Sequence, residues 1–174
     1  MKPYFLALTL LFALQLHAEP GYQKLQDQKL ETYSFNGYLE SYHSDFRESL
    51  VVNGSLFASK SRFSELEVNG EARLHECILY DYGIIRGELI VDHSVLEGPI
   101  EAAARQVAIV RCVTDNIKIN HAGDYEGPQI LKISRGSVIN GNIVFESRNG
   151  QVHLSRDSRI LGGVIGGTIC PFIE

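Results

Sequence analysis

The feature that most constrains this chain is a glycine that recurs at intervals of 16 or 17 residues. Gly37, Gly54, Gly70 and Gly87 follow one another at steps of 17, 16 and 17 residues. The flanking residues repeat with them, so that the second position before and the second position after each glycine are apolar. These positions hold Phe35, Val52, Val68 and Ile85, and Leu39, Leu56, Ala72 and Leu89. Such self-similarity is typical of a chain that stacks copies of one short unit.

Each unit has the alternation of β-strands. Apolar and polar residues alternate over four to six positions, with Val, Ile, Phe and Leu prominent, which favours strands over helices. A unit of about 17 residues is too short for the helix pairs of common helical repeats. We therefore predict an all-β, single-domain parallel β-solenoid, or β-helix, over residues 35–174. Eight coils at a strand spacing of about 4.8 Å would form a rod roughly 38 Å tall.

The repeat changes in the second half of the chain. A fifth unit fits if Arg105 replaces the glycine, which places Ala103 at the second position before it. Residues 133–143 then align with residues 154–164 at a step of 21. Residues 121–129 match no unit and are rich in Gly, Pro and polar side chains, which indicates a loop inserted between coils.

Asparagine precedes the glycine in several units. The predicted corner and ladder residues are Gly37, Gly54, Gly70, Gly87 and Gly141 together with Asn36, Asn53, Asn69 and Asn140. Glycine marks a corner where a side chain would clash or where φ is positive. Equivalent asparagines in stacked coils can hydrogen-bond to one another as a ladder. Asn-Gly is also favourable turn chemistry by itself, and the two interpretations are compatible.

A second column, seven residues after each glycine, holds small side chains. Its members are Ser44, Ser61, Cys77, Ser94 and Cys112. The two cysteines are two coils apart, about 9.6 Å by twice the strand spacing, whereas a disulfide needs Cα atoms within about 7 Å. We therefore predict no Cys77–Cys112 bond, with Ser94 between the thiols. A redox pair is the alternative to a column of small buried side chains, and Cys170 is a candidate for a bond between two chains.

The N-terminus has the pattern of a secretory signal peptide. Lys2 precedes an apolar run over residues 5–16, and the small residue Ala18 follows, which predicts removal of residues 1–18. The protein is therefore expected to be exported, periplasmic or secreted, with no transmembrane segment in the mature chain. Residues 19–34 are polar with spaced apolar residues and predict a cap over the N-terminal end of the solenoid.

The charge of the chain argues against several partners. With 16 Lys and Arg against 21 Asp and Glu the formal net charge is −5, and loss of residues 1–18, which hold one base and no acid, makes it −6. Binding to nucleic acid needs a basic footprint, and so does a polybasic contact with a membrane surface. We therefore expect neither partner.

Few residues form a pattern that carries chemistry. His75 and Asp92 stand five residues after their glycines in adjacent coils, so we expect them to touch, and a His–Asp pair can serve a general base. His43 and His93 share a column with residues of both charges, which is typical of a solvated face and not of a metal site. No pair of carboxylates can be nominated for glycoside hydrolysis, and no phosphate-binding loop is present. The sequence therefore assigns no catalytic, cofactor-binding or metal residue.

The short units with Val-Asn-Gly and Ile-Asn-Gly, in coils of about 17 residues, resemble the bactofilins, the polymer-forming β-helical scaffold proteins of bacteria. The resemblance covers residues 35 to about 165. It implies a right-handed β-helix without cofactor or catalytic residues, and a role in filaments or membrane-associated sheets. The chain departs from the family in its export signal and in the insertion at residues 121–129.

Three functions remain open from the sequence. The first is a structural or scaffold role, in which the rod self-associates or binds partners through its ends or a flat face. The second is a recognition module for glycans or a surface partner along the long face, with an aromatic stripe formed by Tyr38, Tyr42, Tyr80, Tyr82 and Tyr125. The third, an enzyme acting on a polysaccharide, needs clustered carboxylates that the pattern does not supply.

Overall fold

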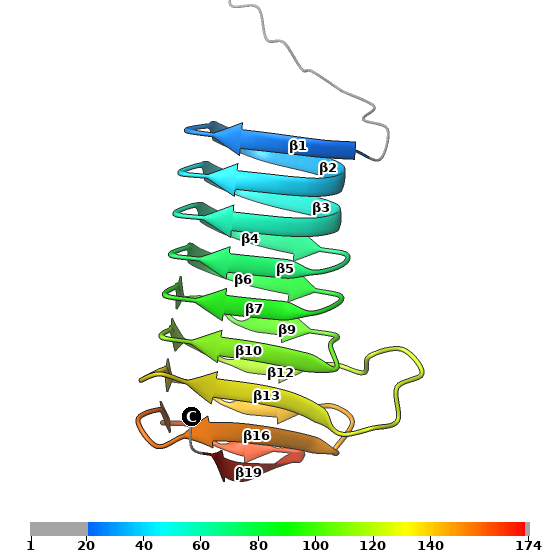
Figure 1. Ribbon diagram of the computed structural model, residues 1–174, viewed down its shortest axis with the longest axis vertical. Coiled ribbons are helices and arrows are strands. Elements are labelled where there is room, and N and C mark those ends of the chain that lie inside the picture. Colours follow the sequence, from blue (N-terminus) through cyan, green and yellow to red (C-terminus); the bar gives the residue numbers. More distant parts are fainter. Residues whose placement is uncertain (1–20, 173–174) are drawn as a thin grey trace, which may run out of the picture.

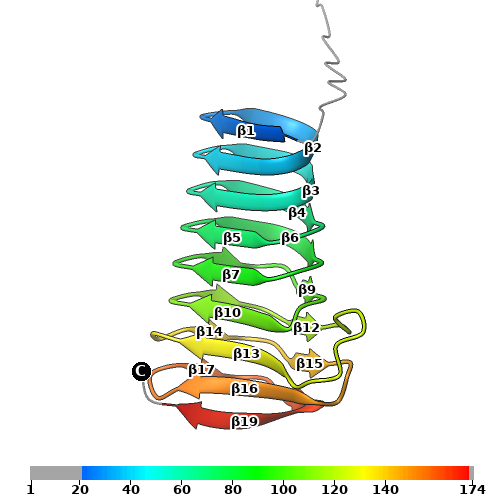
Figure 2. The same cartoon turned by 45° about the vertical axis from the view of Figure 1, so that its right-hand side comes forward.

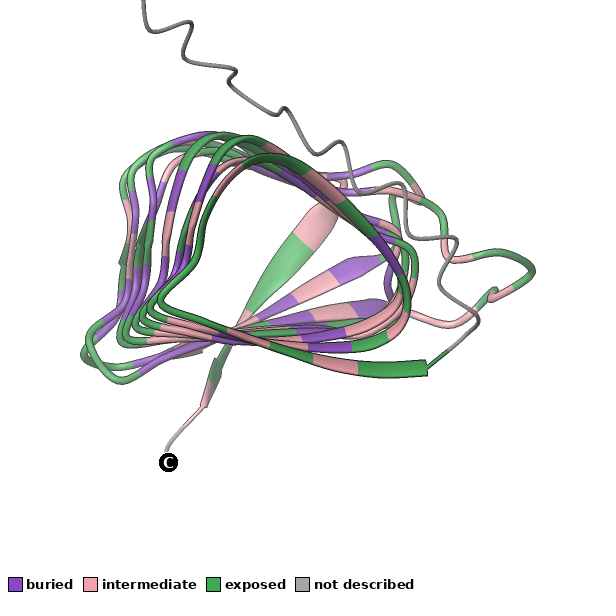
Figure 3. Ribbon diagram, turned by 90° about the horizontal axis from the view of Figure 1, so that it is seen from above, coloured by how far each residue is buried: buried purple, intermediate pink, exposed green. Residues whose placement is uncertain are grey.

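The fold is a single stack of β-coils. The computed structural model describes residues 21–172, which contain strands and turns but no helix. Their strands form one parallel sheet that winds about nine times around a common axis, with coils of about 17 residues (Figure 1). Seen from the N-terminal end, the chain turns clockwise as it recedes, so the coil is right-handed (Figures 1 and 3). The predicted all-β parallel solenoid is confirmed.

Within the described residues the coils consist of nineteen strands. In chain order they are β1 (Gly21–Gln26), β2 (Lys29–Tyr42), β3 (Asp45–Ser59), β4 (Arg62–Val68), β5 (Ala72–His75), β6 (Ile78–Ile85), β7 (Leu89–Asp92), β8 (Val95–Leu96), β9 (Ile100–Ala102), β10 (Gln106–Val110), β11 (Val113–Thr114), β12 (Ile117–Ile119), β13 (Gln129–Ser134), β14 (Val138–Ile139), β15 (Ile143–Phe145), β16 (Gly150–Ser155), β17 (Arg159–Ile160), β18 (Val164–Ile165) and β19 (Gly167–Phe172). The long strands β2 and β3 continue around corners, whereas the later coils are divided into three short strands.

Figure 2 shows the stack of coils from the side, and the view from above in Figure 3 shows that the cross-section of the rod is roughly triangular. Face A consists of β1, β5, β7, β10, β13, β16 and β19, with residues 37–42 of β2 and 54–59 of β3. Face B consists of β8, β11, β14 and β17 with the first residues of β2, β3, β4 and β6. Face C consists of β9, β12, β15 and β18 with the middle parts of β2 and β3 and the later parts of β4 and β6. A shift of register, as between Leu30 and Thr32, marks the bend from face B to face C.

Stacking brings the same position of every coil into one column. The inward column of face A consists of Leu39, Leu56, Ala72, Leu89, Val107, Leu131 and Val152. All of these side chains are buried. On face B the rings of Phe46 and Phe63 stack with centroids 5.3 Å apart. The prediction that the apolar flanks of the units share one interior is therefore confirmed, because each coil covers the flank of the next.

The corner between β9 and β10 departs from the regular repeat. Ile85 pairs with Ala102, and not with Ala103 as the predicted register requires. Four positions separate Ile85 from Leu89 at the earlier corner, but five separate Ala102 from Val107 here. This corner has lost its glycine and carries one extra residue. The predicted register was therefore wrong by one position before the corner, and it was correct from Val107 onward.

The insertion is a loop at the next corner between faces C and A. It was predicted at residues 121–129 and spans residues 120–128, between β12 and β13 (Figure 1). Gln129 is instead the buried first residue of β13, and its Nε2 donates to the carbonyl groups of Ala104 and Asn120 at 2.8 and 2.7 Å. The side-chain oxygens of Gln129 and Asn120 are buried without a hydrogen-bond partner in the described chain. A surface hollow of about 630 Å³ lies between the loop and the two preceding corners of the same edge.

The N-terminal segment predicted as a cap, residues 19–34, is part of the solenoid where it is described. Residues 21–34 form β1 and the start of β2, with Gly21 opposite Gly37 and Leu25 opposite Ser41. The spaced apolar residues of this segment therefore mark inward strand positions, and the solenoid begins earlier than residue 35. The predicted signal peptide, residues 1–18, lies outside the described residues and stays a prediction.

Close stacking explains the recurring glycine. Gly37, Gly54, Gly70 and Gly87 have φ values from +127° to +158°. A Cβ atom on Gly54 would lie 2.1 Å from the carbonyl oxygen of Gly37 in the preceding coil. Both the positive φ and the contact exclude a side chain, so the repeat requires glycine at this corner.

Replacement of Gly54 by alanine is expected to destabilise the rod by about 2–4 kcal/mol, because the added methyl group would collide with the backbone of the preceding coil. Gly163→Ala is the matched control, since its new Cβ would have its nearest neighbour atom at 3.5 Å. Denaturant unfolding followed by circular dichroism compares the two variants. Equal losses in both would contradict the steric explanation.

Candidate functional site

The asparagines of three successive corners form a ladder along one edge of the rod. Asn69 donates its side-chain amide to Asn53 at 2.7 Å, and Asn53 donates to Asn36 at 2.8 Å. Arg86 takes the next place and donates to Asn69 at 2.6 Å and to Glu67. The ladder satisfies these side chains within the rod itself, so its role is structural.

Asn140 and Gly141 stand at a different corner from the other Asn-Gly pairs. They lie between β14 and β15, where face B meets face C, and not between faces C and A. A second ladder runs along this corner: Asn116 Oδ1 accepts from the backbone N–H of Asn142 at 2.8 Å, and Asn142 Oδ1 accepts from that of Gly163 at 2.8 Å. The sequence analysis missed this ladder. The signal for it is the Asn-Ile step that opens both β12 and β15.

The column of small residues is a hydrogen-bonded ladder inside the rod. The backbone N–H of Cys77 donates to Ser94 Oγ at 2.9 Å, and that of Ser94 donates to Cys112 Sγ at 3.4 Å. Each side chain also donates to the carbonyl two or three residues before it, as Ser94 does to Asp92 at 2.9 Å. Equivalent hydrogen bonds from a backbone N–H to a side-chain oxygen of the next coil extend the ladder to Ser44, Ser61, Ser137 and Ser158. The column therefore needs a small side chain that both donates and accepts, which Ser and Cys supply.

A left-handed residue precedes this column in each regular coil. The residues are His43, Lys60, Glu76, His93 and Arg111, with φ between 49° and 53°. Successive side chains of a strand point to opposite sides, but this conformation places two consecutive residues outside. Asp92 and His93 thus both reach solvent, and Ser94 is buried. All five left-handed residues are exposed, in line with the solvated face predicted for this column.

The two thiols of the small-residue column are reduced and protected. Cys77 and Cys112 are buried and make no disulfide, with Ser94 between them. Burial raises the pKa of both thiols to about 11. The reactive form of cysteine is the thiolate, so this environment does not favour a redox pair. Cys170 is half-buried on β19 and unpaired within the chain; a bond from it to a second chain stays a prediction.

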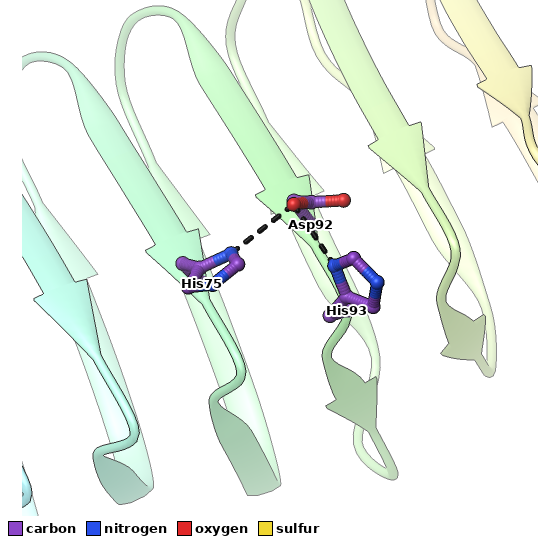
Figure 4. Close-up of side chains that lie close together, drawn as sticks. All are labelled: His75, Asp92 and His93. Atoms are coloured by element: carbon purple, nitrogen blue, oxygen red, sulfur yellow. Dashed lines mark hydrogen bonds and ion pairs between the residues drawn. The ribbon is translucent and has the colours of Figure 1, made fainter.

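A cluster of titratable side chains lies where β5 and β7 end. His75 and Asp92 pair across adjacent coils, with His75 Nδ1 at 3.1 Å from Asp92 Oδ2, and His93 Nδ1 lies 3.0 Å from the same oxygen (Figure 4). Arg111 in the following coil donates to both oxygens of Asp92, at 2.8 and 3.0 Å. On the other side, His75 Nε2 lies 3.2 Å from Glu76 Oε1. Five charged or titratable groups therefore converge at one edge of face A.

The environment of Asp92 keeps its carboxylate ionised. Partial burial on its own would raise the pKa of Asp92, but hydrogen bonds from His93 and Arg111 outweigh this and hold the pKa below its usual value. An imidazole beside an ionised carboxylate is the arrangement of a general base, as expected for His75 with Asp92. The side chains of Cys77 and Ser94 donate to the backbone carbonyls of His75 and Asp92 and not to the imidazole, so neither is placed as a nucleophile that this base activates.

The five tyrosines expected to form one stripe lie in three separate places. Tyr38 and Tyr42 stand on face A, Tyr80 and Tyr82 lie on β6 at the bend from face B to face C, and Tyr125 lies in the inserted loop. They do not align because each pair occupies a different position of its repeat unit. The stripe on which the recognition module was based is therefore absent from the described residues.

A smaller aromatic cluster covers the first two coils of face A. Tyr22, which the sequence analysis did not single out, stacks on Tyr38 with ring centroids 5.9 Å apart. The hydroxyl groups of Tyr22 and Tyr42 both donate to Glu40 Oε2 at 3.2 Å. A groove of about 190 Å³ lies beside Tyr38 and Arg73. Gly21, sixteen residues before Gly37, was the signal that would have placed Tyr22 in this column.

The two ends of the described rod differ in chemistry. In the first coil the inward positions include Gln23 and Tyr33, and the Tyr33 hydroxyl donates to Gln23 Oε1 at 2.7 Å. Burial raises the pKa of Tyr33, so this hydroxyl keeps its proton. In the last coil the inward positions hold Ile160, Val164 and Ile169, which are only partly covered. A polar pair thus spans the interior at one end, and apolar side chains line it at the other.

Comparisons with known proteins do not assign the chain to a family. No family model, no curated protein and no solved structure matches it. The resemblance to the bactofilins therefore rests on the pattern of the units alone. Within residues 21–172 there is no helix with the length and apolar character to cross a bilayer.

The inward ladder predicts different effects for two substitutions at one position. Ser94→Ala should lower the free energy of unfolding by about 1–3 kcal/mol, because the buried N–H of Cys77 loses its acceptor. Ser94→Cys should stay close to the wild type, since cysteine already occupies the same position in two other coils. Thermal and denaturant unfolding measure both. A cysteine variant as unstable as the alanine variant would argue against the ladder.

Burial of two thiols predicts unequal reactivity with a thiol reagent. At pH 8 the native protein should react quickly at Cys170 alone, because a pKa of about 11 leaves Cys77 and Cys112 with roughly one thiolate per thousand molecules. All three thiols should react once the chain is unfolded. Cys170→Ser is the control and should remove the fast phase. More than one fast thiol in the native wild type would contradict the burial of the column.

Proposed function

We propose that the protein is an exported structural rod whose C-terminal end pairs with the same end of a second copy. This is the scaffold role expected from the repeat, with the contact assigned to one end. The observation that carries it is the apolar interior that is only partly covered at the last coil of residues 21–172. Ile169 is half exposed there, whereas Val152, at the same position one coil earlier, is fully buried. The export part of the proposal rests on residues 1–18.

The most exposed aliphatic side chains of residues 21–172 lie on the last coil. Leu161, Ile165 and Ile169 expose 63, 57 and 49% of their surface, compared with 39 and 43% for Val95 and Val113 in the middle of the rod. Contiguous exposed apolar surface marks contact sites in soluble proteins. The three residues lie within one turn of the chain, with Ile169 at an inward position of the end and Ile165 at an outward position of face C beside it.

The strand edges of the last coil support the same partner. Within residues 21–172 no strand pairs with β17, β18 or β19 on the C-terminal side. An open edge presents unpaired N–H and C=O groups that accept another strand. The inward polar pair of Gln23 and Tyr33 makes the N-terminal end, which also holds Leu25 and Leu30, less apolar than this surface. Pairing of like ends, which is self-complementary and closed, is therefore favoured over an open head-to-tail filament.

The aromatic cluster favours a second candidate, recognition of a glycan on face A. Stacked Tyr22 and Tyr38 offer ring faces, and Glu40 and Arg73 offer polar groups beside a groove. Aromatic side chains with a polar edge suit ligands that are apolar on one side and polar on the other. The cluster covers two coils of the rod, so this candidate ranks below the end-to-end contact.

Light scattering of the purified protein tests the pairing. We expect a concentration-dependent dimer for the wild type and a monomer for Ile169→Glu, because a carboxylate opposes burial in an apolar contact. Ile165→Glu should give the same result from a residue outside the inward column, which separates loss of pairing from loss of β19. Val113→Glu is the matched control on face B and should pair like the wild type.

Two outcomes would overturn this proposal. One is a wild-type protein that stays strictly monomeric at high concentration. The other is an equal loss of pairing in the Val113→Glu control. Electron microscopy distinguishes pairs of rods joined by like ends from continuous filaments, and filaments would contradict the pairing of like ends.

A further inference from the structure

We propose that His75, Asp92 and His93 bind a divalent transition-metal ion, with Zn²⁺ as the reference ion. One ligand atom from each residue lies within 4.8 Å of the others, and the three side chains point toward one another (Figure 4). The proposal concerns the edge of face A and is independent of the pairing of ends. It also revises the expectation that the column of His93 is solvated surface alone.

The fold brings the three side chains together in two ways. Parallel pairing places His75 directly beside Asp92, at the last positions of β5 and β7. The left-handed backbone of His93, with φ of 49°, turns its side chain to the same side as that of Asp92. Neighbouring residues on a regular strand would point apart, so this cluster depends on the corner.

The spacing of the ligand atoms is close to that of a zinc site. Asp92 Oδ2 is 3.1 Å from His75 Nδ1 and 3.0 Å from His93 Nδ1. Ligands at the usual Zn–N and Zn–O distances of about 2.1 Å in tetrahedral geometry lie roughly 3.4 Å apart. The ligand atoms of the two histidines lie within 4.8 Å of each other. Both imidazoles are partly exposed, so they can rotate to bring all three ligand atoms to the spacing of a bound ion. Two imidazoles and one carboxylate favour Zn²⁺ over Mg²⁺ or Ca²⁺.

The contacts of the two imidazoles show which nitrogens face the centre of the cluster. His93 Nδ1 lies 3.0 Å from Arg111 Nε, a donor, and 3.0 Å from Asp92 Oδ2, an acceptor. His75 faces a carboxylate oxygen with each nitrogen, Asp92 at 3.1 Å and Glu76 at 3.2 Å. An ion bound by both Nδ1 atoms leaves His75 Nε2–H free to donate to Glu76. A ligating histidine that donates to a carboxylate is the usual second shell of a metal site.

Arg111 limits the affinity of the site. It holds Asp92 Oδ1 at 2.8 Å, which orients the carboxylate with Oδ2 toward the two histidines. It also contacts Oδ2 and His93 Nδ1, both at 3.0 Å, and its charge is permanent. Ion binding requires Arg111 to give up these two contacts while keeping Oδ1. Removal of the guanidinium should therefore tighten binding.

Calorimetric titration of the untagged protein with ZnCl₂ at pH 7.5 tests the proposal. We expect one ion per chain, and a loss of affinity of about tenfold or more in His75→Ala and in His93→Ala. His43→Ala is the matched control, because His43 occupies the same left-handed column three coils from His93. Arg111→Gln should bind Zn²⁺ more tightly than the wild type. Co²⁺ in place of Zn²⁺ supplies an absorption spectrum that should change in His93→Ala but not in His43→Ala.

Circular dichroism of each variant shows whether the rod remains folded, which is expected because the substituted side chains lie on its surface. The proposal is overturned if the wild type binds no Zn²⁺, or if His43→Ala weakens binding as much as the two ligand variants do. Weaker binding in Arg111→Gln would contradict the role given to Arg111 and, with it, the arrangement of ligands described above.

Discussion

Backbone hydrogen bonding between successive coils is the interaction on which the rest of this structure depends. Each strand pairs in parallel with its equivalent in the next coil, so equal positions recur at about 4.8 Å along the rod. A column accepts only side chains that tolerate their own kind at that spacing. Glycine meets this condition where Gly54 lies against the carbonyl of Gly37, asparagine meets it by bonding to asparagine, and serine or cysteine meets it by accepting a neighbouring N–H. The repeat in the sequence results from this restriction on each column.

The same requirement explains how much of the fold could be predicted. Leu39, Leu56, Ala72 and Leu89 could be aligned from the glycine steps alone, and they share one buried column. Ala103 was misplaced because an alignment of units does not reveal at which corner an extra residue is accommodated. Asn140 was grouped with Asn36 because the same dipeptide suits two different corners of a coil. The first coil was missed because its inward positions include the polar residues Gln23 and Tyr33, which hide the alternation.

The titratable cluster shows where a column-by-column prediction reaches its limit. The contact of His75 with Asp92 followed from their equal place in adjacent units, and the two side chains do meet. His93 and Arg111 were assigned to a separate, solvated column. Their contacts with Asp92 depend on the left-handed backbone of His93. The residue types at this position of the repeat do not predict that conformation. Chemistry at the surface of a solenoid thus arises between columns, at corners where consecutive residues face the same way.

The irregular corner before Val107 has a mechanical consequence. A stack whose members touch only their two neighbours behaves as a one-dimensional chain of links, and its cooperativity is set by the junctions. The extra residue at Ala103, the hollow of about 630 Å³ and the orphaned oxygens of Gln129 and Asn120 all fall near one such junction. Heat or tension applied along the axis should open the molecule there first. The five coils before this weak link and the coils after it would then melt as two blocks.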